Sequence, residues 1–235
     1  MRALDPNTVE AALEDDFHQF TVVVRHDASV VTGISATAGR WPWSTCPDAG
    51  AQLEQLVGME LSPRCTAVAE IADPRWQCTH QFDLAGLAVA HATRDTPDRQ
   101  YDIEVPPAEA DGQRTVQLSR DGARLLAWTI TYGAGLSAPA PFTEAPWRGG
   151  FIKWADATFG PDAAEAAIVL RRACDIGMGR GMDLEGYRTA EELADIMTGV
   201  CYSMQPAIMP VAFRNIGSIR DFADHPEALL SHHVV

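Results

Sequence analysis

Residues 75–91 hold the densest group of side chains that could do chemistry: an indole, a thiol, two imidazoles and a carboxylate. Apolar residues recur here at helical spacing after a threonine suited to a helix start, which predicts a helix over about 79–93. His80 and Asp83 would lie on one face, close enough for the carboxylate to orient the imidazole. The positive end of the helix dipole favours the neutral imidazole, the form that acts as a base. We therefore predict a general base at the start of this helix.

A packing role is the alternative interpretation of both histidines in this helix. A histidine at a helix start often only caps the helix or packs beside it. His91 lies three turns after His80, about 16 Å further along the axis. The two imidazoles therefore cannot share one metal ion, and we expect His91 to be a half-buried histidine with satisfied hydrogen bonds.

Aromatic and cationic side chains elsewhere are candidates for substrate binding. Trp41 and Trp43 stand in a loop rich in proline and turn residues, where they would either cover a flat apolar ligand or anchor the loop to the core. Arg25 and Arg75 could bind a carboxylate or phenolate, although most arginines form surface ion pairs. Tyr101 could donate a proton from its phenol or simply face the core. We expect these four side chains to bind substrate and Tyr101 to act as the proton donor.

The chain lacks the usual signatures of metal and cofactor sites. It contains no HExxH motif and no clustered Asp motif, and apart from the adjacent His232 and His233 it has no close histidine pair. It also lacks a glycine-rich loop between a strand and a helix, and it lacks GxSxG. Lys153, the sole lysine, could form a Schiff base if desolvated, or it could lie on the surface of an amphipathic helix. We expect neither a metal nor a cofactor.

Charge and hydropathy exclude several classes of partner. The net charge is −14 at pH 7, which disfavours nucleic acids and anionic membranes, since both need a basic face. No apolar run is long enough to span a bilayer, and the N-terminus lacks the apolar core of a signal peptide. The five cysteines form no CxxC pair, which is typical of reduced thiols. We expect a cytoplasmic protein.

The pattern of apolar residues predicts the elements that carry these side chains. Helices are expected after Pro6 and at 47–57, 79–93, 163–178 and 190–202. Strands are expected at 20–25, 30–38, 100–105, 115–118 and 123–132. The fold class is therefore α+β, with one curved antiparallel sheet of about five strands packed against helices that lie mainly in the C-terminal half. We expect a single domain over residues 1–235, a soft boundary at 133–150 and a homodimer face on the helices of the second half.

Three short segments resemble a bacterial family of unknown function, DUF 2889: residues 43–47, residues 77–84 and the tail at 217–222. The likeness spans most of the chain. Proteins of this family resemble companions of aromatic-compound catabolism in proteobacteria and actinobacteria, which implies a small aromatic substrate, such as a lignin-related phenol. The family has no agreed catalytic residues, so the resemblance transfers no role to any residue.

The expected function combines the candidate base with this substrate class. We expect a cofactor-independent lyase that uses His80 as the base, with Asp83 holding its tautomer. The reaction would be either a retro-aldol-like release of formaldehyde or a hydration or dehydration, with the charge stored on a phenolate or carbonyl. The alternative is a non-catalytic protein that binds an aromatic ligand or serves as an accessory subunit. The sequence leaves the substrate, the bond broken, the stereochemistry and the oligomeric state open.

Overall fold

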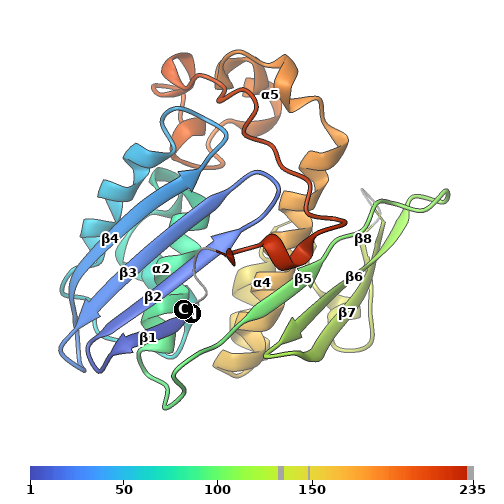
Figure 1. Cartoon of the computed structure of the whole chain (residues 1–235). Coiled ribbons are helices and arrows are strands. Elements are labelled where there is room, and N and C mark those ends of the chain that lie inside the picture. The colour runs from blue at the N-terminus through green and yellow to red at the C-terminus, as the bar shows by residue number, and fades with distance from the viewer. Residues whose placement is uncertain (132–134, 148, 232–235) are drawn as a thin grey trace. The chain divides into compact units, whose positions relative to one another are not determined.

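The computed structural model describes residues 1–131, 135–147 and 149–231 (Figure 1). The chain forms two compact units, Met1–Pro97 with Asp183–Val235, and Asp98–Met182. The single domain over 1–235 stays a prediction, and the boundary expected at 133–150 lies partly outside the described residues. Among the described residues, no helix is both long and apolar enough to cross a membrane.

The first unit contains an antiparallel sheet in the order β1-β2-β3-β4, drawn in blue in Figure 1. Its strands are β1 (Arg2–Asp5), β2 (Thr8–Glu14), β3 (Gln19–His26) and β4 (Val31–Arg40). The β3–β4 hairpin confirms the two strands predicted at 20–25 and 30–38. The helix predicted after Pro6 is wrong, because the segment that follows Pro6 forms β2. Val9 and Ala11 alternate inward and pair with β3, so packing at the strand period overrides the local helix signal.

Helix α2 (Thr79–His91) confirms the helix predicted at 79–93 and packs against β2 and β3. Its N-cap is Cys78 rather than a threonine. Phe20, Val22 and Val24 alternate on the face of β3 that α2 covers, and all three are buried. His91 is also buried, more deeply than the sequence predicts. The other helices before residue 98 are short, namely α1 (Val68–Ile71) and the 3-10 helices Pro47–Leu56, Cys65–Ala67 and Pro74–Trp76.

The C-terminal part of this unit is built from short turns of helix. The helix predicted at 190–202 is wrong in its extent, because only the 3-10 turn Ala190–Leu193 and α5 (Ala194–Met197) form. Gly199, with φ of 78°, ends the helical path, and its N–H donates to the carbonyl of Met204. The remaining 3-10 helices here are Leu184–Gly186, Tyr202–Met204, Met209–Val211 and Pro226–Ala228.

The second unit has its own antiparallel sheet in the order β5-β6-β7-β8. Its elements are β5 (Tyr101–Glu104), β6 (Gln113–Arg120), β7 (Ala123–Thr131), β8 (Gly135–Ser137), α3 (Phe151–Thr158), α4 (Pro161–Gly177) and the 3-10 helices Phe142–Glu144 and Met178–Gly181. The Asp121–Gly122 turn has φ of 52° and 79°, as a tight hairpin requires. The predicted strands 100–105, 115–118 and 123–131 are therefore confirmed, and residue 132 lies outside the described residues.

The α+β class is confirmed, but the expected single sheet of about five strands is wrong. The described residues form two four-stranded sheets. Among the described residues, the helices do lie mainly in the C-terminal half, where α3, α4 with 17 residues and α5 follow residue 150, although α2 with 13 residues lies in the first half. The extra strands arise mainly from β1 and β2, whose alternation is short and is broken by a proline.

The β3–β4 turn gives a first testable prediction. Asp27 Oδ1 accepts hydrogen bonds from the N–H of Ser29 at 3.0 Å, the N–H of Val30 at 2.9 Å and the hydroxyl of Ser29 at 2.8 Å. The bonds from Val30 and Ser29 lower the pKa of Asp27 to about 2. Because this folded-state pKa lies below the ordinary 3.8, the ionised side chain stabilises the fold above about pH 4. That stabilisation is lost as the pH falls through about 2.

We therefore expect Asp27→Ala to lower the melting temperature at neutral pH. The difference from the unmodified protein should shrink as the pH falls from about 4 to about 2. Thermal melts of both proteins across that range, followed by circular dichroism, check this expectation. A difference that does not change with pH would show that the carboxylate charge contributes nothing to the turn.

Candidate functional site

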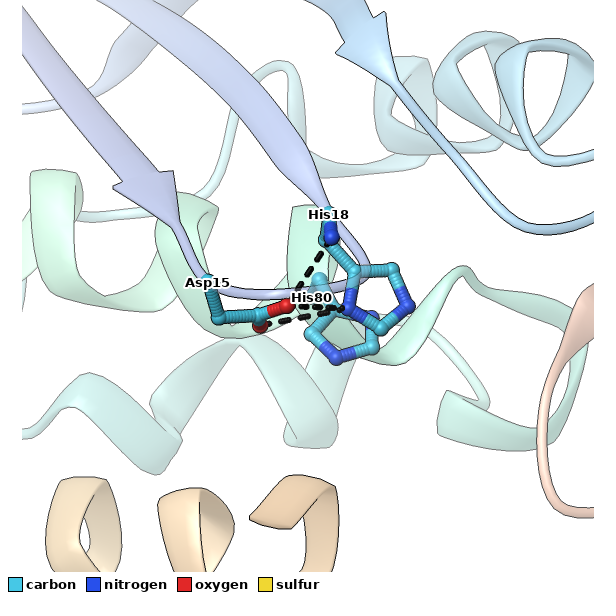
Figure 2. Close-up of side chains that lie close together, drawn as sticks. All are labelled: Asp15, His18 and His80. Atoms are coloured by element: carbon cyan, nitrogen blue, oxygen red, sulfur yellow. Dashed lines mark hydrogen bonds and ion pairs between the residues drawn. The ribbon is translucent and has the colours of Figure 1, made fainter. Parts of the chain in front are cut away.

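The predicted base, His80, lies in the first turn of α2 and stacks on a second histidine that the sequence analysis missed. The ring centroids of His18 and His80 are 3.8 Å apart and their planes are inclined by 30° (Figure 2). Phe20 continues the stack, with centroids 5.8 Å from His18 and 6.0 Å from His80. His18 precedes β3 and lies two residues before Phe20, so both share the face that α2 covers. The two-residue spacing between His18 and Phe20 is the feature of the sequence from which His18 could have been predicted to face α2.

A half-buried carboxylate, that of Asp15, orients His18. Asp15 Oδ1 lies 3.0 Å from His18 Nδ1 and accepts the backbone N–H groups of Phe17 at 2.7 Å and His18 at 2.9 Å (Figure 2). Burial raises the pKa of Asp15, but the charges of His18 and His80 and these hydrogen bonds outweigh burial, so the pKa falls below its ordinary value. An ionised carboxylate only accepts hydrogen bonds, so His18 Nδ1 carries the proton in this contact. Asp15 thus fixes the tautomer of His18.

Asp83, the carboxylate that the sequence analysis assigned to this orienting role, lies half-buried in the first turns of α2. Its role as the partner of His80 stays a prediction. Asp15 could not be predicted for this role from the sequence, because nothing in the sequence shows that the turn between two strands packs beside the start of a helix more than sixty residues later.

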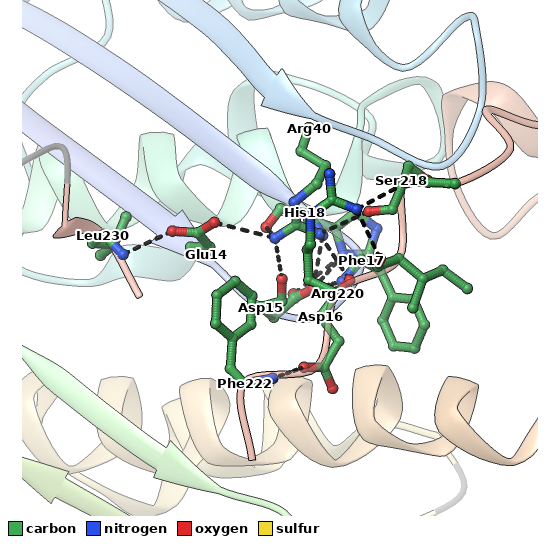
Figure 3. A network of polar contacts seen from close by, with 12 residues as sticks. Glu14, Asp15, Asp16, Phe17, His18, Arg40, Ser218, Arg220, Phe222 and Leu230 are labelled. Carbon is green, nitrogen blue, oxygen red and sulfur yellow. Dashed lines mark hydrogen bonds and ion pairs between the residues drawn. The ribbon is translucent and has the colours of Figure 1, made fainter. Parts of the chain in front are cut away.

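Arg40 holds the turn that carries Asp15 and His18. Its Nη1 donates to the carbonyls of Asp16 at 2.7 Å and Ser218 at 3.2 Å, and its Nη2 donates to the carbonyls of Asp15 at 2.5 Å and His18 at 3.3 Å (Figure 3). This guanidinium is buried. Charged donors to carbonyls are stronger than neutral ones, so the turn between β2 and β3 is held in one conformation.

The C-terminal tail also packs on this turn. Glu14 pairs with the guanidinium of Arg40 at 3.2 Å and accepts the N–H of Leu230 at 2.7 Å (Figure 3). The backbone N–H of Arg220 donates to the carbonyl of Asp16 at 2.8 Å. The tail, Arg40 and the β2–β3 turn therefore form one polar network beside the histidine stack.

An open groove of about 570 Å³ adjoins this network. The residues that line it include Arg40, Arg220, Trp41, Phe222 and Gln19. Gln19 alternates with Phe20 along β3, so it faces the side of the sheet opposite α2. The groove and the histidine stack therefore flank the same end of the sheet from opposite faces.

The two loop tryptophans have different environments. Trp41 is half-buried and lines the groove, where its ring can contact a ligand. Trp43 is buried, bridges to Arg214 through the backbone and lies beneath that guanidinium, 5.8 Å from the ring centroid. This environment matches the alternative interpretation of an anchor to the core. Cys46, at the end of the same loop, is buried, and burial raises its thiol pKa to about 12, which makes it a poor nucleophile.

Both of the predicted substrate arginines are exposed. Arg25 is exposed near the far end of β3 from His18, about 20 Å along the strand. Arg75 is exposed and pairs with Asp73 at 2.7 Å. The arginines that the structure does place at the groove are Arg40 and Arg220. Binding of substrate by Arg25 or Arg75 stays a prediction.

Tyr101, the predicted proton donor, lies on β5 in the second unit. Its hydroxyl donates to Glu165 Oε1 at 2.8 Å, and Arg99 donates to the same carboxylate oxygen at 3.0 Å. Burial, together with the adjacent charge of Glu165, raises the pKa of Tyr101 well above its ordinary value. These contacts make Tyr101 part of a buried ion-pair network. Its role as a proton donor stays a prediction.

Comparisons with known proteins find a match for only part of the chain. No curated protein and no solved structure matches it. The part that matches a family model runs from β1 to just beyond α2, so it contains Asp15, His18, Arg40 and His80. Residues 4–94 match the family described as "Protein of unknown function (DUF2889)", which confirms the family resemblance over this segment.

Proposed function

We propose that the protein is a lyase that acts on a small aromatic compound, such as a lignin-related phenol, by acid–base chemistry without a cofactor. The observation that carries this proposal is the stack of His18 on His80 beside the half-buried carboxylate of Asp15. Imidazole is the side chain most often used for proton transfer near neutral pH. The predicted single base, His80, thereby becomes one member of a pair.

The pair supports an acid and a base in one place. The Nδ1–H of His18 donates a hydrogen bond to the carboxylate of Asp15, so Nε2 is the ring nitrogen that can take a proton from a substrate. The centroids of the two rings lie 3.8 Å apart, so both imidazoles can reach the same substrate. One ring can therefore act as the base while the other acts as the acid.

The retro-aldol form of the reaction balances with these groups alone. The neutral imidazole removes the hydroxyl proton of a hydroxymethyl substituent, and the C–O bond becomes the C=O bond of formaldehyde. The C–C bond breaks, and its electron pair moves into a carbonyl conjugated with that carbon, which gives an enolate that an imidazolium then protonates on carbon. In a phenol the order is reversed: the imidazolium first protonates the ring carbon that bears the hydroxymethyl group, and the electron pair of the broken C–C bond then restores the ring as a phenolate. Dehydration uses the same two groups, with water as the leaving group and a C–H bond as the proton source.

The groove favours a second candidate function, in which the protein binds an aromatic anion without changing it. The rings of Trp41 and Phe222 offer flat apolar surfaces, and Arg220 supplies a guanidinium at the same groove. This groove does not need the histidine stack in order to bind a ligand. The binding function and the lyase function therefore predict different sensitive residues.

A thermal-shift screen against hydroxymethyl phenols and aryl acids, with mass spectrometry of each hit after incubation, separates the two functions. A hit that stabilises the protein and loses the mass of formaldehyde or of water supports the lyase, and the mass lost names the bond broken. A hit that stabilises the protein and is recovered unchanged supports the binding function. In that second case we expect Trp41→Ala to abolish the thermal shift and His18→Gln to leave it in place.

We also propose a cytoplasmic location. All five cysteines are free thiols, which is what a reducing compartment maintains. Fractionation of cells that produce the protein checks this location. The homodimer stays a prediction, which light scattering of the purified protein can check.

A further inference from the structure

The histidine stack and its carboxylate form a set of metal-ligand types. One oxygen of Asp15, one ring nitrogen of His18 and one ring nitrogen of His80 all lie within 4.8 Å of one another. Two of these residues come from the β2–β3 turn and its exit, and the third comes from the first turn of α2 (Figure 2). Two imidazoles and one carboxylate are ligands that suit zinc and other divalent first-row metals.

We propose that Asp15, His18 and His80 bind a divalent transition-metal ion, for which Zn²⁺ is the simplest probe. The inference shares its residues with the proposed lyase but concerns what occupies the site, so it can be tested without a substrate. It also departs from the expectation of no metal. That expectation rested on the absence of histidines close together in the sequence, whereas the fold brings together two that are far apart.

The charges around the cluster favour a cation. Among the described residues, the ion pair that the Asp15 carboxylate forms is with His18, at 3.0 Å. Arg40, the nearest guanidinium on this turn, is directed instead at backbone carbonyls and at the carboxylate of Glu14. A carboxylate that is half-buried and ionised is stabilised by a positive partner. At this site that partner is either a proton on an imidazole or a bound cation.

The geometry is close to what a metal needs but not fully preformed. The 3.0 Å between Asp15 Oδ1 and His18 Nδ1 suits two ligands of one ion, given bonds of about 2.0–2.2 Å to zinc. The two rings lie one over the other with their planes inclined by 30°, so we expect their lone pairs to converge on one ion only after the His80 ring rotates about its Cβ–Cγ bond. Binding would also replace the hydrogen bond between Asp15 and His18, and His18 would then keep its proton on Nε2.

Three protein ligands leave a further coordination position open. This is the arrangement of catalytic rather than structural zinc sites. An ion held here could polarise a hydroxyl or carbonyl oxygen of a substrate, which assists both C–C cleavage next to a carbonyl and loss of water. Imidazoles bound to an ion cannot take a proton from a substrate, so a metal-bound site would be an alternative to the acid–base pair of His18 and His80 rather than an addition to it.

Metal binding is tested on the full-length protein after treatment with a chelator and removal of that chelator. Zn²⁺ is added in competition with a chromophoric chelator, and Co²⁺ is added separately to record the absorption bands of its coordination sphere. We expect saturable binding of Zn²⁺ and Co²⁺ bands typical of nitrogen and oxygen ligands. Asp15→Asn, His18→Gln and His80→Gln should each weaken Zn²⁺ binding by at least about 10–100-fold, because even an indirect partner of a ligand is worth that much.

His26→Gln is the matched control, since His26 is also buried but sits at the opposite end of β3. It should bind Zn²⁺ as the unmodified protein does. Circular dichroism of each variant confirms that it is folded, and His80→Gln, which leaves the Asp15–His18 contact intact, serves if the other two unfold. The inference is overturned if the unmodified protein binds no Zn²⁺, or if folded variants of the three residues bind it equally well.

Turnover of a confirmed substrate by the metal-free protein is measured beside the binding experiment. Substrate turnover without any metal binding would overturn the metal inference and leave the acid–base lyase standing. Metal binding without turnover of any substrate would support the metal inference and count against the lyase. The two proposals can therefore fail separately.

Discussion

Replacing His18 with glutamine is expected to lower the turnover of a confirmed substrate by about 10²–10⁴, the usual contribution of a positioned acid or base. Glutamine cannot carry a proton between substrate and protein, although it fills much of the same volume. The loss should be in kcat, because the reacting proton moves only in the transition state. Steady-state kinetics of the purified variant, with its melting temperature recorded beside them, measure this effect.

His80→Gln should have a similar effect, and the double variant should be little worse than either single one. Residues that act as one unit are strongly non-additive, since removing either of them disables the unit. His26→Gln is the control, because His26 is buried and its Nδ1 lies 3.1 Å from the N–H of Ala28, in the turn far from the stack. Turnover by His18→Gln within about twofold of the unmodified protein would contradict the assignment of a base or acid to this residue.

Replacing Arg40 with methionine is expected to cost about 3–5 kcal/mol of folding free energy. The guanidinium is buried and binds carbonyls of the β2–β3 turn and of the tail, together with the carboxylate of Glu14. Its removal leaves a nearly buried carboxylate and several carbonyls without their donor. Urea denaturation of the variant, fitted with a fixed slope, measures the loss.

Arg75→Met is the matched control for Arg40. The Arg75 side chain is 74% exposed and forms a surface pair with Asp73, so its removal should change stability by no more than about 1 kcal/mol. If Arg40→Met were as mild as Arg75→Met, the polar network would not hold the turn. In that case, the positions of Asp15 and His18 would need another explanation.

The elements that the sequence predicts well are those with strong local signals. The helix that carries His80, the β3–β4 hairpin and the β6–β7 hairpin follow from apolar spacing and turn residues within a dozen positions. The sequence of residues 8–14 is ambiguous, because Val9 and Leu13 fit the apolar face of a helix as well as an alternating strand. Pairing with β3 decides between the two, and that pairing is a property of the fold.

The residues of the candidate site also differ in whether a local signal in the sequence predicts them. His80 could be singled out from its neighbours in sequence, but its partners His18 and Asp15 become visible only when β3 packs against α2. Trp41 could be expected to face an aromatic ligand, whereas the groove beside it needs the tail, including Phe222, to fold back over the sheet. Such long-range contacts leave no periodicity in a single sequence.

The most direct test of the central claim, that chemistry takes place at the histidine stack, is nuclear magnetic resonance of the imidazole nitrogens. Spectra of ¹⁵N-histidine-labelled protein are recorded with and without an unreactive analogue of a confirmed substrate, and the His18→Gln and His80→Gln variants assign the signals. We expect the ring signals of His18 and His80 to shift on binding, while those of His26 and His225 stay in place. Saturating analogue that leaves both His18 and His80 unchanged would contradict the account.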